Sequence, residues 1–448
     1  MFQKILVANR GEIAVRVIRA CKEMGILCVA VYSTADKEGL WVNLADEAVC
    51  IGGPVAKDSY LNIDAVLSAA VVSGAEAIHP GYGFLSENAE FARKCAANNV
   101  EFIGPSPEVI EKMGDKSVAR QIMKAAGVPV IPGCDAVKDL ADGLAKAKQL
   151  GFPVLIKARS GGGGKGIRAA ADEKEFEKAY NLAVSEAVAN FGDGSVYLEK
   201  SMSDVKHIEM QIIGDKFGNI VCMGERDCSM QLRNQKLIEE APANIPDTAR
   251  NAMIRASVAA GKFVKYVGVG TIEYLYDPGK KAFFFMEMNT RLQVEHPVTE
   301  FVTQRDLVKW QIRVAAGCKL GFTQGVAKTH GHAIECRINN EVANPDNKIS
   351  VLHIANGPWV RFDSAIYGNY QIPPFYDSMI GKLVVWSTER DKAIRKMKAA
   401  LCELIIDGVA TNIDFQYDLL CSQGFADTTY TTKFVDRFLA GRDKENKK

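Results

Sequence analysis

The chain has 448 residues, 48% of them hydrophobic and 24% charged, with a formal net charge of +1. This length predicts about three domains, or one elaborate module with a lid, and the hydrophobic content is ample for large cores. A net charge near zero excludes a general basic field for nucleic acid or an anionic membrane, so any anionic ligand must be bound by local groups.

The N-terminus and the cysteines indicate a cytoplasmic protein. The apolar run near Met1 is too short for a signal peptide, and no stretch approaches the roughly 18 consecutive apolar residues of a membrane span. The 11 cysteines are odd in number, scattered and without a C-x-x-C pair. This pattern favours reduced thiols over disulfides or a zinc site, and the closest pair, Cys222 and Cys228, is interpreted as core residues.

The first hundred residues predict a parallel α/β layer. Helices are expected at residues 11–24 and 63–73. The turn at residues 9–12 lacks the G-x-G-x-x-G of a dinucleotide site. The loop at residues 79–88 follows a strand at its carboxyl end, where open α/β sheets bind ligands; a plain turn is the equal alternative. The expected strands are residues 5–8, 26–31, 47–51, 75–79 and 102–104.

A glycine-rich segment at residues 160–166 joins two expected strands, 153–157 and 167–170. Successive glycines can close backbone N–H groups over phosphate oxygens. A Walker A loop is excluded, because Arg159 and Gly166 occupy the places of its first glycine and its hydroxyl residue. The segment is therefore expected to be a hairpin flap, with a flexible linker as the alternative.

Two further strands carry polar groups whose role the pattern leaves open. The strand at residues 196–200 ends in Glu199 and Lys200, which suit the amino group and ring nitrogen of adenine but equally suit a salt-bridged strand end. His207 and Glu209 share one strand face, and a lone histidine is more often structural than functional.

The strongest chemical signal lies at residues 283–297, where an apolar run ends in polar residues. Strand alternation predicts that Phe283, Phe285, Glu287 and Asn289 share one face. A glutamate and an asparagine at this spacing, at the end of a buried strand, suit a Mg²⁺ ion.

Neighbouring residues complete this candidate site. Glu273 lies within an apolar strand, where an acid is costly unless it is paired or metal-bound, and pairing it with Glu287 would give two carboxylates facing one Mg²⁺. Arg291 suits a small planar anion, and Glu295 is a candidate base. The alternative is a solvated strand end, which would not need a preceding run of phenylalanines.

The remaining sequence predicts more helices and strands. Glu335 and Arg337 should share one face of a strand at residues 331–338. No internal repeat or low-complexity tract is present. The other expected helices are residues 113–126, 173–190, 247–264, 306–316 and 393–406.

Six motifs resemble the biotin carboxylase family of ATP-grasp enzymes, and the resemblance extends over essentially the whole chain. It implies an α/β fold (α+β in parts). Residues 1–114 would form a Rossmann-like pre-ATP-grasp layer, 115–329 an ATP-grasp domain with a mobile lid at about 131–203, and 330–448 a mixed α/β domain. The motifs are residues 8–14, 79–88, 113–116, 225–231, 239–243 and 287–300.

The resemblance also implies the site residues, and it alone points to Lys236 and His207. The implied Mg²⁺ or Mn²⁺ ligands are Glu273, Glu287 and Asn289, and the implied biotin contacts are Arg337 and Tyr82. The implied bicarbonate contacts are Lys236, Arg291, Gln293, the backbone of Val294, and Glu295. The implied ATP contacts are Lys116, Lys157, Gly163, Gly164, Glu199, Lys200, Met202, His207, Gln231, Asn234, Glu273 and Glu287.

The implied activity is ATP-dependent carboxylation of biotin by bicarbonate through carboxyphosphate. Glu295 would be the base, Arg291 and Lys236 would offset the charge of the dianion, and Arg337 would stabilise the biotin enolate. The expected context is the first half-reaction of acetyl-CoA carboxylase in fatty acid synthesis. The alternatives are a subunit of a pyruvate or other acyl-CoA carboxylase, and a non-catalytic ATP-binding regulator.

Expected partners are a biotin carboxyl carrier protein, because the chain ends before any carrier domain, and carboxyltransferase subunits. A homodimer is also expected, since Arg16, Glu23 and Phe362 match family interface positions. Leu232 and Asn234 replace the usual arginine and histidine of the family, and residues 344–348 replace its usual loop.

Overall fold

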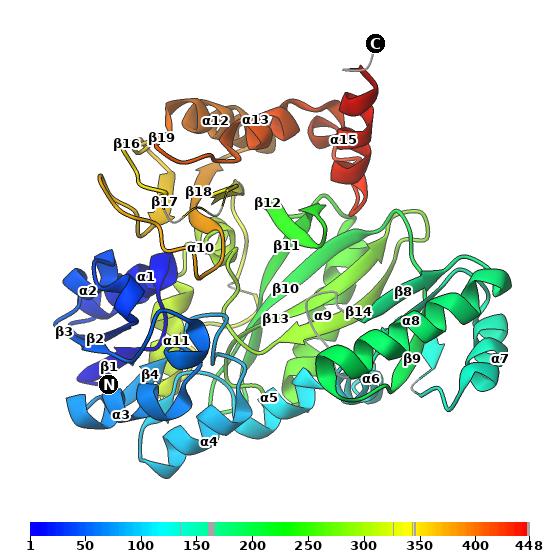
Figure 1. The fold of residues 1–448 in the computed structure, drawn as a ribbon, viewed down its shortest axis with the longest axis horizontal. Helices are drawn as coiled ribbons and strands as arrows, with labels where there is room; N and C mark the ends of the chain where they lie inside the picture. The colour runs from blue at the N-terminus through cyan, green and yellow to red at the C-terminus, as the bar shows by residue number, and fades with distance from the viewer. Residues whose placement is uncertain (135, 160–165, 326, 343, 345, 446–448) are drawn as a thin grey trace.

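The computed structural model describes residues 1–134, 136–159, 166–325, 327–342, 344 and 346–445. Figure 1 shows the N-terminal layer at one end of the molecule, a long central sheet, a smaller sheet with its helices at the other end, and the C-terminal helices above. Within these residues, we find no helix that combines the length and apolarity needed to cross a bilayer.

The N-terminal layer is a parallel sheet, as predicted, and its five strands lie in the order β3-β2-β1-β4-β5. Consecutive residues of β1 are buried, as expected for a parallel strand covered on both faces. Asn88 caps α4 by accepting a hydrogen bond from the backbone of Phe91. The elements are β1 (Lys4–Val7), α1 (Gly11–Glu23), β2 (Leu27–Tyr32), η1 (Thr34–Asp36), α2 (Leu40–Leu44), β3 (Glu47–Cys50), η2 (Ala56–Asp58), α3 (Ile63–Ser73), β4 (Ala77–His79), α4 (Ala89–Ala97), β5 (Glu101–Phe102) and α5 (Pro107–Gly114).

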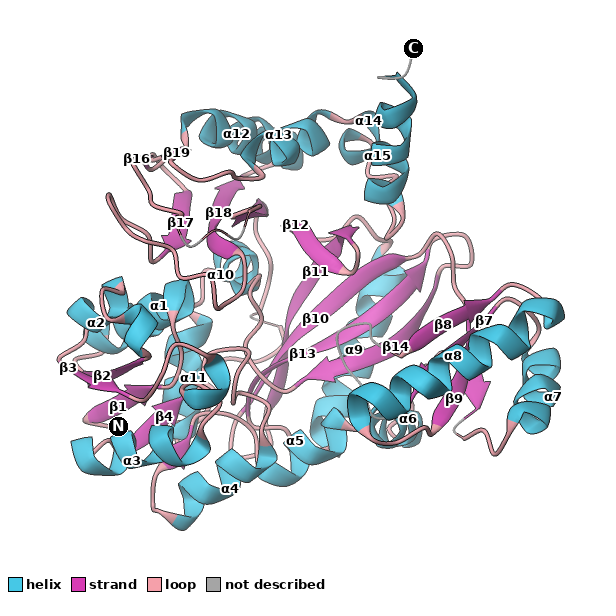
Figure 2. Cartoon of the chain, in the orientation of Figure 1, coloured by secondary structure: helices cyan, strands magenta, loops and turns pink. Residues whose placement is uncertain are grey.

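A separate four-stranded antiparallel sheet of order β6-β9-β7-β8 carries two helices and lies beside the central sheet (Figure 2). Pairing of Val154 with Ala170 confirms the predicted hairpin. The glycine-rich residues 160–165 between its strands lie outside the described residues. The elements are α6 (Lys116–Ala125), β6 (Gly133–Cys134), α7 (Leu140–Leu150), β7 (Val154–Ala158), β8 (Ile167–Ala170), α8 (Glu173–Phe191) and β9 (Val196–Lys200).

The central sheet has eight antiparallel strands in the order β14-β13-β10-β11-β12-β15-β18-β17. The pair β12–β15 joins the strands of the expected ATP-grasp region to those of the expected C-terminal region, so both regions share one sheet. The elements up to residue 315 are β10 (Lys206–Gly214), β11 (Ile220–Leu232), β12 (Gln235–Ala241), α9 (Asp247–Phe263), β13 (Gly268–Asp277), β14 (Ala282–Asn289), α10 (His296–Thr303) and α11 (Leu307–Ala315).

The C-terminal elements cover one end of this sheet. The helix predicted to continue to residue 406 ends at Glu403, so that boundary was wrong. Leu404 and Ile406 are buried whereas Ile405 is 44% exposed, a two-residue alternation that suits strand β19 rather than a helix. The elements are β15 (His332–Asn339), β16 (Val351–His353), β17 (Val360–Ser364), β18 (Met379–Ser387), α12 (Arg390–Glu403), β19 (Ile405–Asp407), α13 (Ile413–Cys421), α14 (Gln423–Ala426) and α15 (Phe434–Glu445).

A bulge interrupts β14 just before its polar end. Glu273 of β13 pairs with Glu287, whereas the next residue, Tyr274, pairs with Phe285. Met286 therefore has no cross-strand partner. At this point β14 advances by two residues while β13 advances by one.

The bulge corrects the prediction that Phe283, Phe285, Glu287 and Asn289 share one face. Because paired residues lie on the same face, both phenylalanines face the apolar core. Beyond the bulge the alternation changes phase, so Glu287 and Asn289 lie with Glu273 on the opposite face. The extra residue lets one short strand present aromatic rings to the core and polar ligands to the site.

A buried ionic cluster attaches the C-terminal helices to the back of the sheet. Glu240 of β12 bonds to Nε2 of His332 at 2.8 Å, to Nε of Arg390 at 2.8 Å and to the hydroxyl of Tyr430. Burial would raise the pKa of Glu240, but His332 and Arg390 together lower it to about 2.

We expect Phe285→Ala to lower the free energy of unfolding by about 3–5 kcal/mol, because it leaves a cavity in the core. Phe285 is 4% exposed and packs in one cluster with Tyr274 and Met288. Chemical denaturation followed by circular dichroism measures the change. Phe217→Ala is the control, since Phe217 is 63% exposed; equal effects of the two substitutions would contradict the packing described.

We expect Glu240→Gln to lower stability near neutral pH by about 3 kcal/mol. The folded-state pKa lies below the ordinary value, so the carboxylate contributes its stability above about pH 4.5 and loses it as the pH falls toward about 2. Urea midpoints of both proteins, measured at several pH values, should therefore converge on acidification. A difference that widens at low pH would contradict the ion cluster.

Candidate functional site

The candidate site is built on one face of the central sheet, where β10 to β14 present polar side chains. At its centre the ammonium of Lys236 contacts three carboxylates. It lies 2.7 Å from Oε1 of Glu295 and 3.3 Å from Oε1 of Glu273, and it also bonds to Glu209. Burial would lower the pKa of Lys236, but the three acids raise it well above its usual value. Lys236 is therefore a permanent cation.

Glu295 is fully buried and lies between two cations. Its Oε1 accepts a hydrogen bond from Lys236, and its Oε2 lies 3.0 Å from the guanidinium of Arg337. Burial and nearby Glu209 would raise the pKa of Glu295, but Lys236 and Arg337 lower it on balance. The carboxylate is thus ionised at neutral pH and free to accept a proton.

Glu273 is held by donors from three directions. Nε2 of His207 lies 2.9 Å from one of its oxygens, and the amides of Asn289 and Gln293 each donate to the other at 2.8 Å. Burial would raise the pKa of Glu273, but Lys236 and His207 lower it. Four of the predicted site residues therefore meet at one carboxylate.

Arg291 is oriented by its neighbours and by the N-terminal layer. Its Nη1 and Nη2 donate to Gln293 at 2.9 Å and Asn289 at 3.1 Å, while its Nε donates to Glu87 at 2.7 Å. Glu87 belongs to the loop at residues 79–88, so this loop reaches the site, as the functional interpretation of its sequence requires.

The predicted metal ligands offer a hard, oxygen-rich site. Glu273 and Glu287 are direct cross-strand neighbours, and Asn289 bonds to Glu273. Burial and the charge of Glu273 raise the pKa of Glu287, although the ammonium of Lys116 lies 3.5 Å from its carboxylate. This excess of negative charge fits a divalent cation that prefers carboxylate and amide oxygens.

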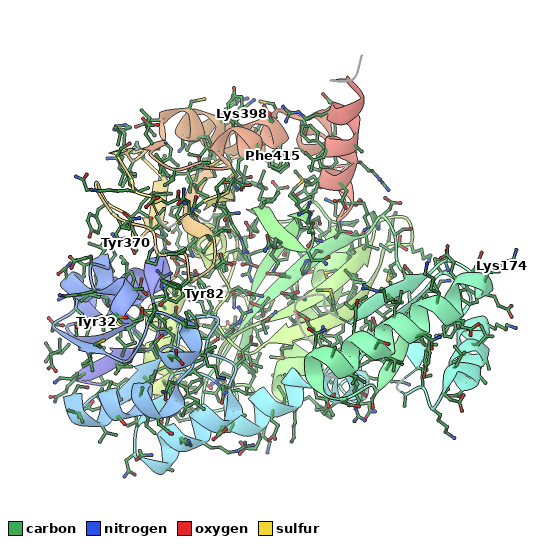
Figure 3. The ribbon with its side chains drawn as sticks, viewed as in Figure 1. Tyr32, Tyr82, Lys174, Tyr370, Lys398 and Phe415 are labelled. Carbon is green, nitrogen blue, oxygen red and sulfur yellow. The ribbon has the colours of Figure 1, made fainter. Side chains whose placement is uncertain are left out.

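Arg337 and Tyr82, the predicted biotin contacts, lie beside this centre. Nε of Arg337 donates to Glu239 at 2.6 Å. The hydroxyl of Tyr82 donates to Glu12, and the ring lies where the N-terminal layer meets the C-terminal strands (Figure 3). The backbone carbonyl of Val294 accepts a hydrogen bond from buried Lys382 at 2.6 Å.

Several predicted nucleotide contacts lie apart from this network. Lys157 and Glu199 pair with each other on β7 and β9. The ammonium of Lys200 donates to the carbonyls of Gly151 and Phe152 at 2.6 and 2.8 Å, so its side chain secures the turn before β7.

The other predicted contacts are half-buried or exposed. Met202 and Gln231 are half-buried, and Gln231 is the cross-strand partner of Lys236. Asn234 is exposed in the turn between β11 and β12. Gly163 and Gly164 lie outside the described residues.

Asn234 suits its turn conformation. Arg233 and Asn234 have φ angles of 51° and 65°, so both lie in the left-handed region, which asparagine tolerates better than most residues. Leu232 and Gln235 pair on either side of this two-residue turn. The departure from the family pattern at 234 is thus compatible with the hairpin that presents Lys236.

Several charged residues of the site have no role predicted from the sequence, and all but Glu87 are buried. Arg226 bonds to Glu209 at 3.0 and 3.2 Å and to Gln211 and Thr299 at 2.7 and 2.9 Å, which fixes Glu209 behind Lys236. The shared strand face of His207 and Glu209 was the available signal. The unassigned charged residues are Glu12, Glu87, Glu209, Arg226, Glu239 and Lys382.

Three family profiles match successive parts of the chain. Residues 115–323 match the profile described as carbamoyl-phosphate synthase L chain, ATP binding domain. With the acids and cations gathered on the antiparallel sheet, this match defines the class as an ATP-grasp enzyme. Residues 1–110 and 335–437 match the N-terminal and C-terminal domains of biotin carboxylase. The chain belongs to the biotin carboxylase family, whose reaction is ATP-dependent carboxylation of biotin.

Known proteins resemble the chain over nearly its full length. It is 52% identical to the biotin carboxylase of a Nostoc species, covering 97% of this chain and 98% of that one. It is 50% identical to a subunit of the pyruvate carboxylase of Methanothermobacter thermautotrophicus, covering 100% and 92%. Among solved structures, the biotin carboxylase domain dimer of Hydrogenobacter thermophilus 2-oxoglutarate carboxylase, in complex with MgADP, ADP and bicarbonate, has a TM-score of 0.92, 45% identity and 98% coverage of each chain.

We expect Lys236→Met to lower stability by about 3–5 kcal/mol, because it leaves three buried carboxylates without their shared cation. The loss should shrink at acidic pH, where the acids become protonated. Thermal unfolding at several pH values measures it. Lys174→Met is the control, since Lys174 is exposed on α8 (Figure 3). A wild-type melting curve for Lys236→Met would contradict this account.

Proposed function

We propose that this protein carboxylates carrier-linked biotin with bicarbonate and ATP, giving carboxybiotin, ADP and phosphate. The observation that carries the proposal is the position of Glu295, an ionised buried carboxylate between Lys236 and Arg337. The proposal is supported because this carboxylate and two cations lie close together. They lie next to Glu273, Glu287 and Asn289, whose oxygens are proposed to bind the metal.

The nucleotide and its metal are assigned to the neighbouring strands. Glu273, Glu287 and Asn289 would hold Mg²⁺, or Mn²⁺, and the metal would neutralise charge on the phosphates. The proposed phosphate and nucleotide contacts include Lys116, which lies beside Glu287. Other ATP contacts are proposed at the positions that the family resemblance implies: Lys157, Gly163, Gly164, Glu199, Lys200, Met202, His207, Gln231 and Asn234.

Bicarbonate activation follows from the charges around Glu295. Arg291 presents guanidinium nitrogens toward Gln293 and Asn289, and Lys236 supplies a second cation. These cations stabilise the doubly charged carbonate that forms when Glu295 removes the proton. An anion held beside Glu295 also raises the pKa of its carboxyl group, which makes the carboxylate a stronger base once the substrate is present.

The second stage uses the same pocket. Carbonate attacks the terminal phosphoryl group of ATP and ADP leaves, and the resulting carboxyphosphate breaks into CO₂ and phosphate. Phosphate removes the ureido proton of biotin, and the guanidinium of Arg337 stabilises the enolate, with Tyr82 as a further biotin contact. The deprotonated ureido nitrogen then captures CO₂ to give carboxybiotin. Because carboxyphosphate is labile in water, a lid at about residues 131–203 would exclude solvent during these steps.

We retain the division into residues 1–114, 115–329 and 330–448 as part of the proposal. A cytoplasmic homodimer is also proposed, with Arg16, Glu23 and Phe362 at its interface. Within the chain Arg16 pairs with Glu300 at 2.7 Å, so a dimer contact there would add to an existing ion pair. The dimeric solved relative supports the homodimer.

The proposed context is acetyl-CoA carboxylase in fatty acid synthesis, with a biotin carboxyl carrier protein and carboxyltransferase subunits as partners. The relative that belongs to a pyruvate carboxylase supports the second candidate, a keto-acid carboxylase. Affinity purification from the native organism distinguishes the two candidates, because the carboxyltransferase that co-purifies identifies the molecule that finally accepts the carboxyl group.

We expect Glu295→Gln to abolish bicarbonate-dependent carboxylation at every biotin concentration, because an amide cannot accept the proton. The rate of carboxybiotin formation from labelled bicarbonate measures it, with Glu389→Gln as the exposed control. Near-wild-type turnover in Glu295→Gln would refute its role as the base, and MgATP binding without turnover in the wild type would favour the regulatory alternative.

A further inference from the structure

Two carboxyl groups lie side by side behind Arg337. Glu239 of β12 and Glu335 of β15 are direct partners in the antiparallel register, so their side chains project from the same face, with Cβ atoms about 5 Å apart. Both side chains are fully buried. Neither belongs to the groups assigned above to nucleotide, metal or bicarbonate.

The two carboxyl groups differ in how many of their oxygens accept a hydrogen bond. Oε1 of Glu239 accepts from Nε of Arg337 at 2.6 Å and lies 2.5 Å from its Nη2, whereas Oε2 of Glu239 has no partner among the described residues. Neither oxygen of Glu335 has a partner within that same part of the chain. The nearby ammonium of Lys382 bonds instead to Glu12 and to the carbonyl of Val294.

The folded protein would be strongly destabilised if Glu239 and Glu335 were both ionised in this geometry. An ionised carboxylate buried without a partner costs several kcal/mol, and a second carboxylate alongside adds repulsion. Burial outweighs the attraction of Lys382 and Arg337 and raises the pKa of Glu335 well above its usual value, and the charges of Glu239 and Glu295 add to the rise. Burial, with the charge of Glu295, raises the pKa of Glu239 to about 7 although Arg337 and Lys236 oppose this.

The charged and titratable groups around the pair come from each neighbouring element. Strand β18 contributes Lys382, and the segment before α10 contributes Glu295, while the N-terminal loop contributes Tyr82. Among the described residues, the groups that interact with the pair include Tyr82, Cys228, Lys236, Glu295, Cys336, Arg337 and Lys382. Lys236 and Arg337 already bond to Glu295 and Glu239, and Lys382 bonds to Glu12. Within the described part of the chain no cation is left to pair with Glu335, so its neutral form avoids an unpaired buried charge.

We propose that Glu335 remains in its acid form and donates its proton to the free oxygen of Glu239, and that this carboxyl pair positions Arg337 for the biotin enolate. The inference rests on the function proposed above, which it deepens by adding two positioning residues. Glu239 contacts Nε and Nη2 of the guanidinium, and Glu295 contacts Nη2 as well. Because Glu335 stays neutral, Glu239 can bind Arg337 as a carboxylate without a second buried negative charge beside it.

The pair makes biotin recognition sensitive to alkaline pH. When the shared proton is lost, two adjacent carboxylates repel each other, and the hold of Glu239 on Arg337 is disturbed. In Glu335→Gln the amide N–H replaces the acid O–H as a donor to Glu239 and does not titrate. The Michaelis constant for biotin should therefore rise at alkaline pH in the wild type and stay constant in this variant.

Infrared difference spectroscopy tests the proton directly and independently of any carboxylation assay. The full-length protein should show the carbonyl band of a buried carboxylic acid at neutral pH, which disappears at alkaline pH and is missing in Glu335→Gln. Glu389→Gln is the control, because Glu389 is exposed and should leave the band unchanged. Absence of this band from the wild type would overturn the inference and leave the proposed function intact.

Kinetics test the positioning role. Glu239→Gln removes the charged acceptor of Arg337 and should raise the Michaelis constant for biotin about tenfold or more. Bicarbonate-dependent ATP hydrolysis without biotin should remain, since it depends on Arg291, Lys236 and Glu295. Loss of both activities together, or an unchanged biotin constant, would overturn the inference, as would an alkaline response in Glu335→Gln identical to that of the wild type.

Discussion

The site depends on one electrostatic constraint, the attraction of three buried carboxylates to the single ammonium of Lys236. Glu209, Glu273 and Glu295 come from β10, β13 and the segment before α10, and without a shared cation they would repel one another. Arg226 secures Glu209 from behind, and His207 secures Glu273. The charges therefore fix the relative positions of several strands as well as the chemistry of the site.

The same constraint separates the site into two parts with different charge. Around Glu287 the acids exceed the cations, which suits a metal ion and a nucleotide. Around Glu295 the cations Lys236 and Arg337 hold the acid ionised, which suits proton removal from an anion. Glu273 contacts both parts, since its oxygens meet Lys236 and Asn289. A change of charge in one part should therefore change the electrostatic environment of the other.

Much of this arrangement was predictable from sequence. The parallel N-terminal layer, the hairpin at residues 154–170 and the pairing of Glu273 with Glu287 followed from hydrophobic periodicity and from the cost of a buried acid. The sequence did not predict which face of β14 each side chain occupies. Periodicity assumes an unbroken alternation and cannot reveal that Met286 is an extra residue. The convergence on Lys236 was also hidden, since ion pairs between distant strands leave no local pattern.

The pairing of β12 with β15 has a consequence for how the molecule can be divided. Because backbone hydrogen bonds continue through this pair, the regions on either side of it cannot rotate independently, and large rearrangements are confined to the smaller sheet and the loops. A fragment cut near residue 330 would expose a full-length strand edge on each piece, and such edges recruit other strands. Proteolysis there should yield aggregates rather than two folded halves.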